Sequence, residues 1–442
     1  MDTLVMVGQF ILCLSILVGL HELGHLLAAK AFGMRVEKFS IGFPPKLFGF
    51  QWGETEYSLG ALPLGGFVKI SGMIDESMDL EQMRSEPKPW EFRSKPAWQR
   101  LIVMMGGIIV NVVTGILIFV ALVYKFGDTY LPAEEARYGI YAGELAQEIG
   151  LRTGDEVIAV NGASYDRFED LSGLDVLLGT DSYYTVRRDG RVIDVPVPND
   201  LMARLSDKDA RAQLLRPIEP FRVGDVVPGS PAEAAGLQPG DEITAVDGTP
   251  IRFFHELQAL TDSLKGQTVV LTVARPDPTE TGPATTETLT AEISEEGRLG
   301  FYSESLLERR TDEYTLAEAI PLGTERAFNV VWANIQGFGK IFRGDVPASK
   351  SISGPIGMAK AFGGSWVQFW SLTGLISMVL AFMNFLPIPA LDGGHVLFLT
   401  WEMVSGRRPS DKFLENSQKV GIVLLLGLMV FAVGNDIFNL FN

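Results

Sequence analysis

The sequence contains little cysteine and little histidine, with one Cys and four His among 442 residues. The single cysteine, Cys13, excludes an intrachain disulfide framework and any zinc or iron–sulfur site built from several cysteines. Basic residues are also scarce, with 37 Lys and Arg against 54 Asp and Glu. Because binding to phosphates needs a basic face, a nucleic-acid partner is not expected.

Charged and apolar residues are segregated along the chain. Residues 126–360 contain 22 Lys and Arg and 38 Asp and Glu, a balance of −16 within a net charge of −17 for the whole chain. Nevertheless, 47% of all residues are apolar and the mean hydropathy is +0.18. The sequence therefore predicts an acidic, water-exposed insert inside an apolar frame that is nearly neutral.

Four apolar stretches are candidates for crossing a bilayer, which takes about 20 residues. They cover residues 3–21, 101–124, 361–391 and 420–435, and further apolar residues can extend the last one past Asp436. The first stretch has no basic residues before it and no Ala-x-Ala site directly after it. We therefore expect it to be retained rather than cleaved as a signal peptide.

The connections between these stretches predict the orientation, because Lys and Arg concentrate on the cytoplasmic side. Nine Lys and Arg lie within residues 31–100 and four within residues 400–419. Both connections are therefore expected on the cytoplasmic side. The N-terminus, the acidic insert and the C-terminus are expected on the opposite side.

The acidic insert contains an internal repeat. The segment GLRTGDEVIAVNG at 150–162 recurs as GLQPGDEITAVDG at 236–248, with eight of thirteen positions identical. Two copies this far apart indicate tandem domains, each with a Gly-rich turn, an apolar strand and an Asn-Gly or Asp-Gly turn. The pattern resembles PDZ domains of the bacterial envelope-protease type, which bind extended peptides by strand addition. The alternative is a spacer whose grooves are never occupied.

Two of the four histidines form the motif His21-Glu22-Leu23-Gly24-His25 at the end of the first apolar stretch. On a helix, His residues at i and i+4 share one face and can bind one zinc ion. Glu22 can then reach a water at that metal and take its proton. The alternative, a hydrated polar cluster at a helix end, explains neither this spacing nor the second motif of the chain.

The second motif, NFLPIPALDGGH, covers residues 384–395 at the end of the third apolar stretch. A catalytic zinc usually has three protein ligands, and Asp392 is the candidate third ligand. Pro387 and Pro389 are expected to break the helix, and broken backbone at membrane depth is tolerated only inside protein or along a cavity. His395 is the alternative third ligand; if it does not bind the metal, it is expected to be a supporting or interfacial histidine. His255 lies in the second repeat and is expected to be structural.

HELGH followed by NFLPIPALDGG resembles the paired motifs of the site-2 protease family of intramembrane zinc metalloproteases, and the resemblance covers the whole chain. It implies a Zn²⁺ ion held by His21, His25 and Asp392, with Glu22 as general base. It also implies further residues that contact the substrate. Gly65, Gly66 and Phe67 belong to a membrane-associated β-hairpin, against which an unwound substrate pairs. Asn384 and Pro387 belong to the second motif.

One feature departs from the family pattern. Relatives often have Gly-Pro-x-x-Asn in the second span, whereas this chain has Gly107-Ile-Ile-Val-Asn111 without the proline. The role of Asn111 therefore stays open at this point.

The fold class expected from the motifs and the resemblance is a polytopic α-helical membrane protein. It has about four transmembrane helices, a membrane-associated β-hairpin and two inserted PDZ-like α+β domains. The helices are expected at 1–32, 98–126, 361–396 and 418–441, and the cytoplasmic-side β region at 33–97. The PDZ-like domains are expected at 128–215 and 220–305, followed by an amphipathic connector at 306–360. The helix within this connector, at 315–345, is expected either at the outer membrane interface or packed on the PDZ-like domains.

The function that follows from the resemblance is hydrolysis of a peptide bond within or near the transmembrane segment of single-span membrane proteins. The expected location is the bacterial inner membrane, with the PDZ-like domains and both termini in the periplasm. The expected substrate is a pre-trimmed anti-sigma factor of an envelope-stress response, or a remnant signal peptide, and the PDZ pair is expected to filter substrates by size.

Two alternative functions come from other classes. A membrane-tethered scaffold would have a broken HExxH motif or lack the aspartate, and this chain has all four residues. A zinc-dependent transporter would need more spans and more polar residues within them.

Overall fold

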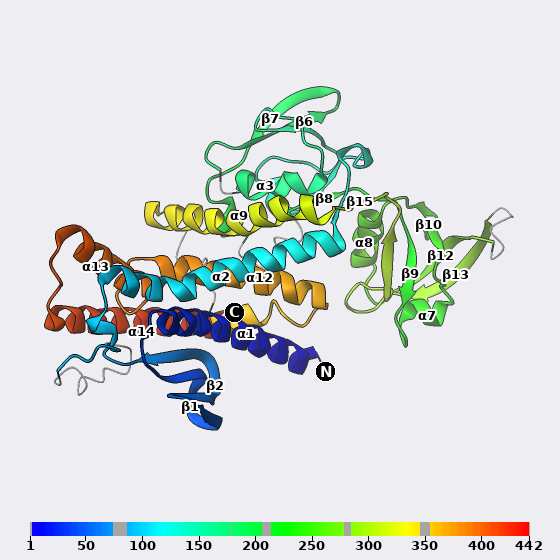
Figure 1. Ribbon diagram of the computed structural model, residues 1–442. Coiled ribbons are helices and arrows are strands. Elements are labelled where there is room, and N and C mark those ends of the chain that lie inside the picture. Colours follow the sequence, from blue (N-terminus) through cyan, green and yellow to red (C-terminus); the bar gives the residue numbers. More distant parts are fainter. Residues whose placement is uncertain are drawn as a thin grey trace. The chain divides into compact units, whose positions relative to one another are not determined.

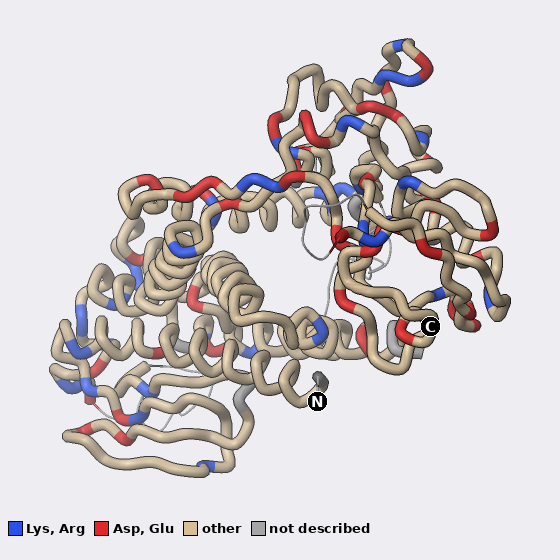
Figure 2. The backbone as a smooth tube through the Cα atoms, turned by 90° about the vertical axis from the view of Figure 1, so that its right-hand side faces the viewer, with Lys and Arg blue, Asp and Glu red and all other residues tan. Residues whose placement is uncertain are grey.

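A computed structural model describes residues 2–73, 86–177, 179–205, 214–277, 284–344 and 354–441. The chain divides into two compact units. The helical unit consists of Met1–Gly127 and Glu313–Asn442, and the inserted unit consists of Asp128–Asp312. Figure 2 shows that the long helices carry few charged residues, in agreement with the segregation of charge in the sequence.

The helical unit contains the four predicted membrane spans. Within the described residues, four helices are long and apolar enough to cross a membrane, so the prediction of a polytopic membrane protein is confirmed. They are α1 (Asp2–Ala31), α2 (Ala97–Phe126), α12 (Trp366–Phe385) and α14 (Asp411–Phe441). Among the described residues, this unit also contains α9 (Leu316–Arg343) and α13 (Asp392–Ser405), which are labelled in Figure 1, and the short helix α11 (Pro355–Ala359).

Helix α2 is the centre of the helical unit, because α1, α9, α12 and α13 all pack against it. Glycines allow α1 and α2 to approach backbone to backbone. A Cβ atom added to Gly24 of α1 would lie 2.2 Å from the carbonyl oxygen of Gly106 in α2. Small residues at a helix crossing are the usual means of close packing in membranes, where apolar burial alone does not drive helices together.

The third span ends where the prolines predict a break. Helix α12 ends at Phe385, and the chain is irregular until α13 begins at Asp392. The backbone folds back on itself here, since a Cβ atom on Gly393 would lie 2.1 Å from the carbonyl oxygen of Leu386. Asp392 is therefore the first residue of a new helix, whose start is fixed by a tight turn.

Strands β1 (Val36–Trp52) and β2 (Thr55–Ile70) form a sheet that packs against α1. The first part of β1 is paired on both sides: Phe39 is opposite Val68 on one side and opposite Tyr57 on the other. Residues 65–70 consequently form one edge of the sheet. In the described part of the chain, no other strand pairs with this edge.

Helix α9, within the predicted connector, packs on the helical unit. Its small residues face α2, and a Cβ atom on Gly323 would lie 2.5 Å from Val120. Near its C-terminal end, Phe338 contacts Phe382 of α12, with ring centroids 5.8 Å apart. The opposite face exposes large apolar side chains, including Phe328 and Trp332. Both faces of α9 are therefore apolar.

The inserted unit has two separate hydrophobic cores, one for each copy of the repeat. Each core is covered by short strands and helices. The first copy contains β4 (Ile140–Ala142), α3 (Glu144–Glu148), β5 (Glu156–Val160), α4 (Leu174–Leu177), β6 (Tyr183–Arg188), β7 (Arg191–Pro196), α5 (Leu201–Arg204) and β8 (Leu215–Pro217). The second contains β9 (Phe221–Val226), α7 (Pro231–Ala235), β10 (Glu242–Val246), β11 (Thr249–Pro250), α8 (Phe254–Ser263), β12 (Thr268–Arg275), β13 (Thr285–Glu292) and β14 (Phe301–Ser305).

The repeated Gly-Asp-Glu sequence makes the same contact in both copies. Asp155 accepts hydrogen bonds from the Arg188 guanidinium, at 2.6 and 2.7 Å, and Asp241 accepts the equivalent pair from Arg275 at 2.8 Å. Both carboxylates are buried, and they raise the pKa of the two guanidinium groups through these hydrogen bonds. The aspartates are thus conformational anchors of the two copies.

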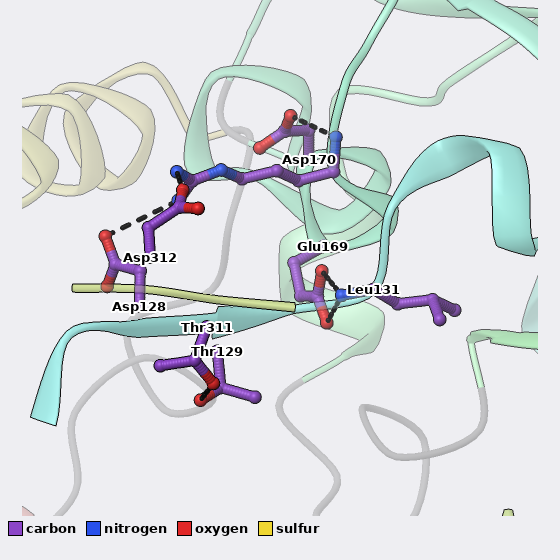
Figure 3. Close-up of polar contacts among 8 residues, drawn as sticks. Asp128, Thr129, Leu131, Glu169, Asp170, Thr311 and Asp312 are labelled. Atoms are coloured by element: carbon purple, nitrogen blue, oxygen red, sulfur yellow. Dashed lines mark hydrogen bonds and ion pairs between the residues drawn. The ribbon is translucent and has the colours of Figure 1, made fainter. Parts of the chain in front are cut away.

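Two short strands, β3 (Asp128–Tyr130) and β15 (Arg310–Asp312), join the ends of the inserted unit. Figure 3 shows their contacts. The hydroxyls of Thr129 and Thr311 are 2.8 Å apart, and Arg167 binds the carboxylate of Asp312 at 3.1 Å. The unit therefore begins and ends at one point, as expected for an insertion between two elements of another fold.

Candidate active site

Three side chains that the sequence analysis singled out converge in the helical unit. His21 Nε2 lies 3.1 Å from Asp392 Oδ2, and His25 Nε2 lies 3.3 Å from the same oxygen. The two imidazole Nε2 atoms are 3.3 Å apart. All three side chains are at most 14% exposed. The HELGH motif on α1 and the start of α13 thus meet across about 370 residues of sequence.

The hydrogen bonding of His25 favours a metal-binding tautomer. His25 Nδ1 lies 2.8 Å from the carbonyl oxygen of Val103, which can only accept, so Nδ1 carries a proton and, in the neutral imidazole, Nε2 carries the lone pair. Asp392 Oδ2 is buried without a hydrogen-bond donor in the described residues. Buried acceptors this close repel one another unless a cation lies between them.

The donor set fits zinc. Tetrahedral Zn²⁺ with nitrogen and oxygen ligands at about 2.1 Å separates neighbouring ligand atoms by about 3.4 Å, close to the three distances observed here. The side chains of His21, His25 and Asp392 supply three ligand atoms and leave a fourth position open. His395 does not belong to this group, and within the described residues these are the three that come together.

Asn111 of α2 supports His21. Its carboxamide nitrogen lies 3.2 Å from His21 Nδ1, and its oxygen is buried without a partner in the described residues. Turning the carboxamide over places the oxygen at Nδ1 and gives His21 the same tautomer as His25, with Nε2 free for a metal. Ser377 in turn donates a hydrogen bond to the Asn111 carbonyl at 2.8 Å. Asn111, whose role the sequence alone does not reveal, therefore lies beside the proposed metal ligand His21.

Gly107 leaves the room that the two imidazoles occupy. A Cβ atom at this position would lie 2.5 Å from His21 Cε1 and 2.5 Å from His25 Nε2. Such a separation is too short for any non-bonded contact, so only glycine fits. In the sequence, Gly107 stands at the start of a family pattern, which does not reveal this reason for the glycine.

A cavity of about 450 Å³ surrounds the three converging atoms. Glu22 lines it, one residue along the helix from His21, as do Gly66 and Phe67 of the free sheet edge. Asn384 and His395 also line the cavity. Among the candidate substrate contacts, Gly65 packs against the Phe43 ring instead, and Pro387 is exposed outside the lining.

The cavity also contains residues that the sequence did not point to. Gln418 of α14 and Met104 of α2 line it, although neither belongs to a motif. The fourth histidine, His255, lies in the inserted unit, where its ring stacks on Phe253 with centroids 5.8 Å apart. Burial lowers the pKa of His255, which agrees with the structural role expected for it.

Comparisons with known proteins decide the family. A sequence profile described as peptidase family M50 matches residues 9–428. The chain belongs to this family, the site-2 proteases. It is 31% identical to the regulator of sigma-E protease RseP of Escherichia coli, over 97% of both chains. It is 28% identical to the regulator of sigma E protease of Haemophilus influenzae, over 98% of both chains. It is also 30% identical, over 98% of both chains, to a protein of Neisseria meningitidis that is named as a zinc metalloprotease.

The resemblance inferred from HELGH and NFLPIPALDGG is therefore confirmed. This member of the M50 family is a membrane metalloendopeptidase of the site-2 protease type, and it is zinc-dependent.

The fit at Gly107 gives a prediction. In Gly107→Ala, the added methyl group displaces the two imidazoles, so we expect the affinity for zinc and the proteolytic activity to fall by about 10–100-fold. Zinc per chain is measured by mass spectrometry of the purified protein. Gly115→Ala is the matched control on the same helix, because its methyl group overlaps the flexible thioether of Met378 and lies at an ordinary contact distance, 3.5 Å, from the Gly374 carbonyl oxygen. Equal zinc contents in the two variants would contradict the account.

Proposed function

We propose that this protease hydrolyses a peptide bond within or near the transmembrane segment of single-span membrane proteins. His21, His25 and Asp392 hold the zinc ion, and Glu22 is the general base. The observation that carries this proposal is the convergence of three buried acceptor atoms in one cavity, beside a carboxylate and a free strand edge.

The chemistry divides between the metal and the chain. Zinc, when bound, polarises the scissile carbonyl group and makes water more acidic. Glu22 takes a proton from the attacking water and later delivers it to the leaving amine nitrogen. The Val103 carbonyl and Asn111 hold the two imidazoles in the orientation that presents Nε2 to the metal.

A substrate helix must unwind before it is cut, because its carbonyl groups are occupied in intrahelical hydrogen bonds. The edge formed by residues 65–70 supports strand pairing with an unwound substrate, since it lines the cavity and no other described strand pairs with it. Close packing places this edge at the catalytic helix: a Cβ atom on Gly66 would lie 3.1 Å from Glu22 Cγ. Exposed aromatic side chains elsewhere on the sheet, including Phe48 and Trp52, support its association with the membrane.

The substrate proposed is an anti-sigma factor that another protease has already trimmed, with remnant signal peptides as a second class. The names of the Escherichia coli and Haemophilus influenzae relatives, which are regulators of sigma E, support the first class. The proposed orientation places the inserted unit in the periplasm of a bacterium, because the basic connections lie on the other side of the spans.

The inserted unit is proposed to be a pair of PDZ-like domains that excludes substrates with large periplasmic domains. Two observations support this: each copy has its own hydrophobic core, and both carry the same buried Asp–Arg anchor.

The roles of the site residues can be separated by measuring zinc and cleavage together. In Glu22→Gln, cleavage of a single-span model substrate is expected to fall by about 10²–10⁴-fold, while zinc remains at one per chain. In His21→Ala and in Asp392→Ala, both zinc and cleavage are expected to be lost, because each variant removes a ligand. Undiminished proteolysis by purified Glu22→Gln protein would overturn the assignment of the base.

The size filter is tested by removing the inserted unit. Because β3 and β15 are paired, a short linker can replace residues 128–312 without stretching the helical unit. The shortened protease is expected to cut single-span substrates that keep their periplasmic domains, as measured by the appearance of the cytoplasmic fragment on gels. The same deletion combined with Glu22→Gln is the control. If only trimmed substrates were cut, the filter would be excluded.

A further inference from the structure

One buried polar side chain in the catalytic cavity has no role in the chemistry described so far. Gln418 of α14 is only 6% exposed, and none of the hydrogen bonds found among the described residues involves its carboxamide. It lines the catalytic cavity and also a second, smaller cavity of about 50 Å³ that adjoins it. Neither polar atom of Gln418 is among the fully buried side-chain atoms without a partner, so the carboxamide is open to the cavity and available to a polar group that enters it.

The position of Gln418 is fixed by the packing of α14. The buried residues of this helix lie on one face, and they are Gln418, Gly421, Ala432 and Asp436. One turn after Gln418, the helix contacts the broken segment of the third span: a Cβ atom on Gly421 would lie 1.8 Å from the Pro389 carbonyl oxygen. Rotation of α14 about its axis is therefore blocked at this end.

The other end of α14 is held by hydrogen bonds. The Asp436 carboxylate accepts from the backbone N–H groups of Gly354, Ile356 and Gly357, at 2.9, 2.8 and 3.0 Å. Asp436 is five helical turns from Gln418 and lies on the same face. The two contacts together keep the Gln418 side chain turned toward the cavity.

An extended substrate needs partners on both of its sides. In a strand, the N–H and C=O groups of one residue point to one side, and those of the next residue point to the other. Pairing with residues 65–70 satisfies only the groups that face the sheet. The remaining groups face the cavity, where an unpaired peptide group costs several kcal/mol at membrane depth.

We propose that Gln418 binds the substrate backbone at this second side. Its carboxamide NH₂ donates to a substrate carbonyl oxygen, and its carboxamide oxygen accepts from the N–H of the same substrate residue. A carboxamide has the same donor and acceptor groups as a peptide bond, so it matches any sequence and selects for an unwound backbone. This inference rests on the proposed function, because it requires the substrate to pair with the sheet edge.

The test uses the full-length protease and synthetic single-span substrates in which one peptide bond at a time is replaced by an ester, which removes one N–H donor. Gln418→Leu keeps the size of the side chain and removes its hydrogen bonds. We expect KM to rise about tenfold, with kcat and zinc content little changed. At one ester position, the losses from the ester and from Gln418→Leu are expected to be non-additive, because both remove the same contact.

Gln9 provides the matched control. It is also a buried carboxamide, but it is paired with the backbone of Gly363 and Gly364. Gln9→Leu is expected to show additive losses at every ester position. If Gln418→Leu cleaved with unchanged KM, or if its losses were additive throughout, Gln418 would be excluded as a substrate contact. If ester replacements still weaken cleavage in both variants, pairing of the substrate with residues 65–70 is retained. If ester replacements have no effect on cleavage by the unmodified protease, that pairing itself is excluded.

Discussion

The structure depends on one electrostatic constraint: two imidazole nitrogens and one carboxylate oxygen lie 3.1–3.3 Å apart in a buried site. With both imidazoles neutral and protonated on Nδ1, all three atoms are acceptors, and a metal cation between them removes their repulsion. The surrounding packing brings them together. Glycines let α2 approach the HELGH helix, and a tight turn after the prolines starts a new helix at Asp392. The packing of the helical unit therefore supports the proposed metal site.

A membrane setting explains the other features of the unit. Polar groups in an apolar frame must be paired, and the groups nearest the metal are: His25 with the Val103 carbonyl, and Asn111 with His21. The cavity offers a substrate backbone two further places to pair, the sheet edge that no other described strand covers and the Gln418 carboxamide. Charge is instead concentrated in the inserted unit, which has its own cores and ends at a single point of attachment.

Much of this arrangement was accessible from the sequence. The uncharged runs predicted all four spans, since hydropathy reflects the thickness of the bilayer. The spacing of His21 and His25 predicted two proposed ligands on one helix face, and the prolines before Asp392 predicted the break between α12 and α13. These features depend on local chemistry, which a sequence displays directly.

Other features depend on contacts between distant segments and could not be predicted in this way. Gly107 matters because two imidazoles lie against it, and Asn111 because it reaches His21 from another helix. Gln418 belongs to no motif and is significant only because α14 turns it toward the cavity. The arginine partners of Asp155 and Asp241 were missed for the same reason, although the repeat had marked both aspartates.

The central claim is that one zinc ion is bound by two histidines and one aspartate. X-ray absorption at the zinc edge of the purified full-length protein tests it most directly, because the signal reports the atoms that surround the metal. The account predicts a four-coordinate ion with two imidazole nitrogens, and with oxygen as the remaining ligands, at about 2.0–2.1 Å. A third imidazole, a sulfur ligand near ~2.3 Å or protein that cleaves its substrate without zinc would contradict it.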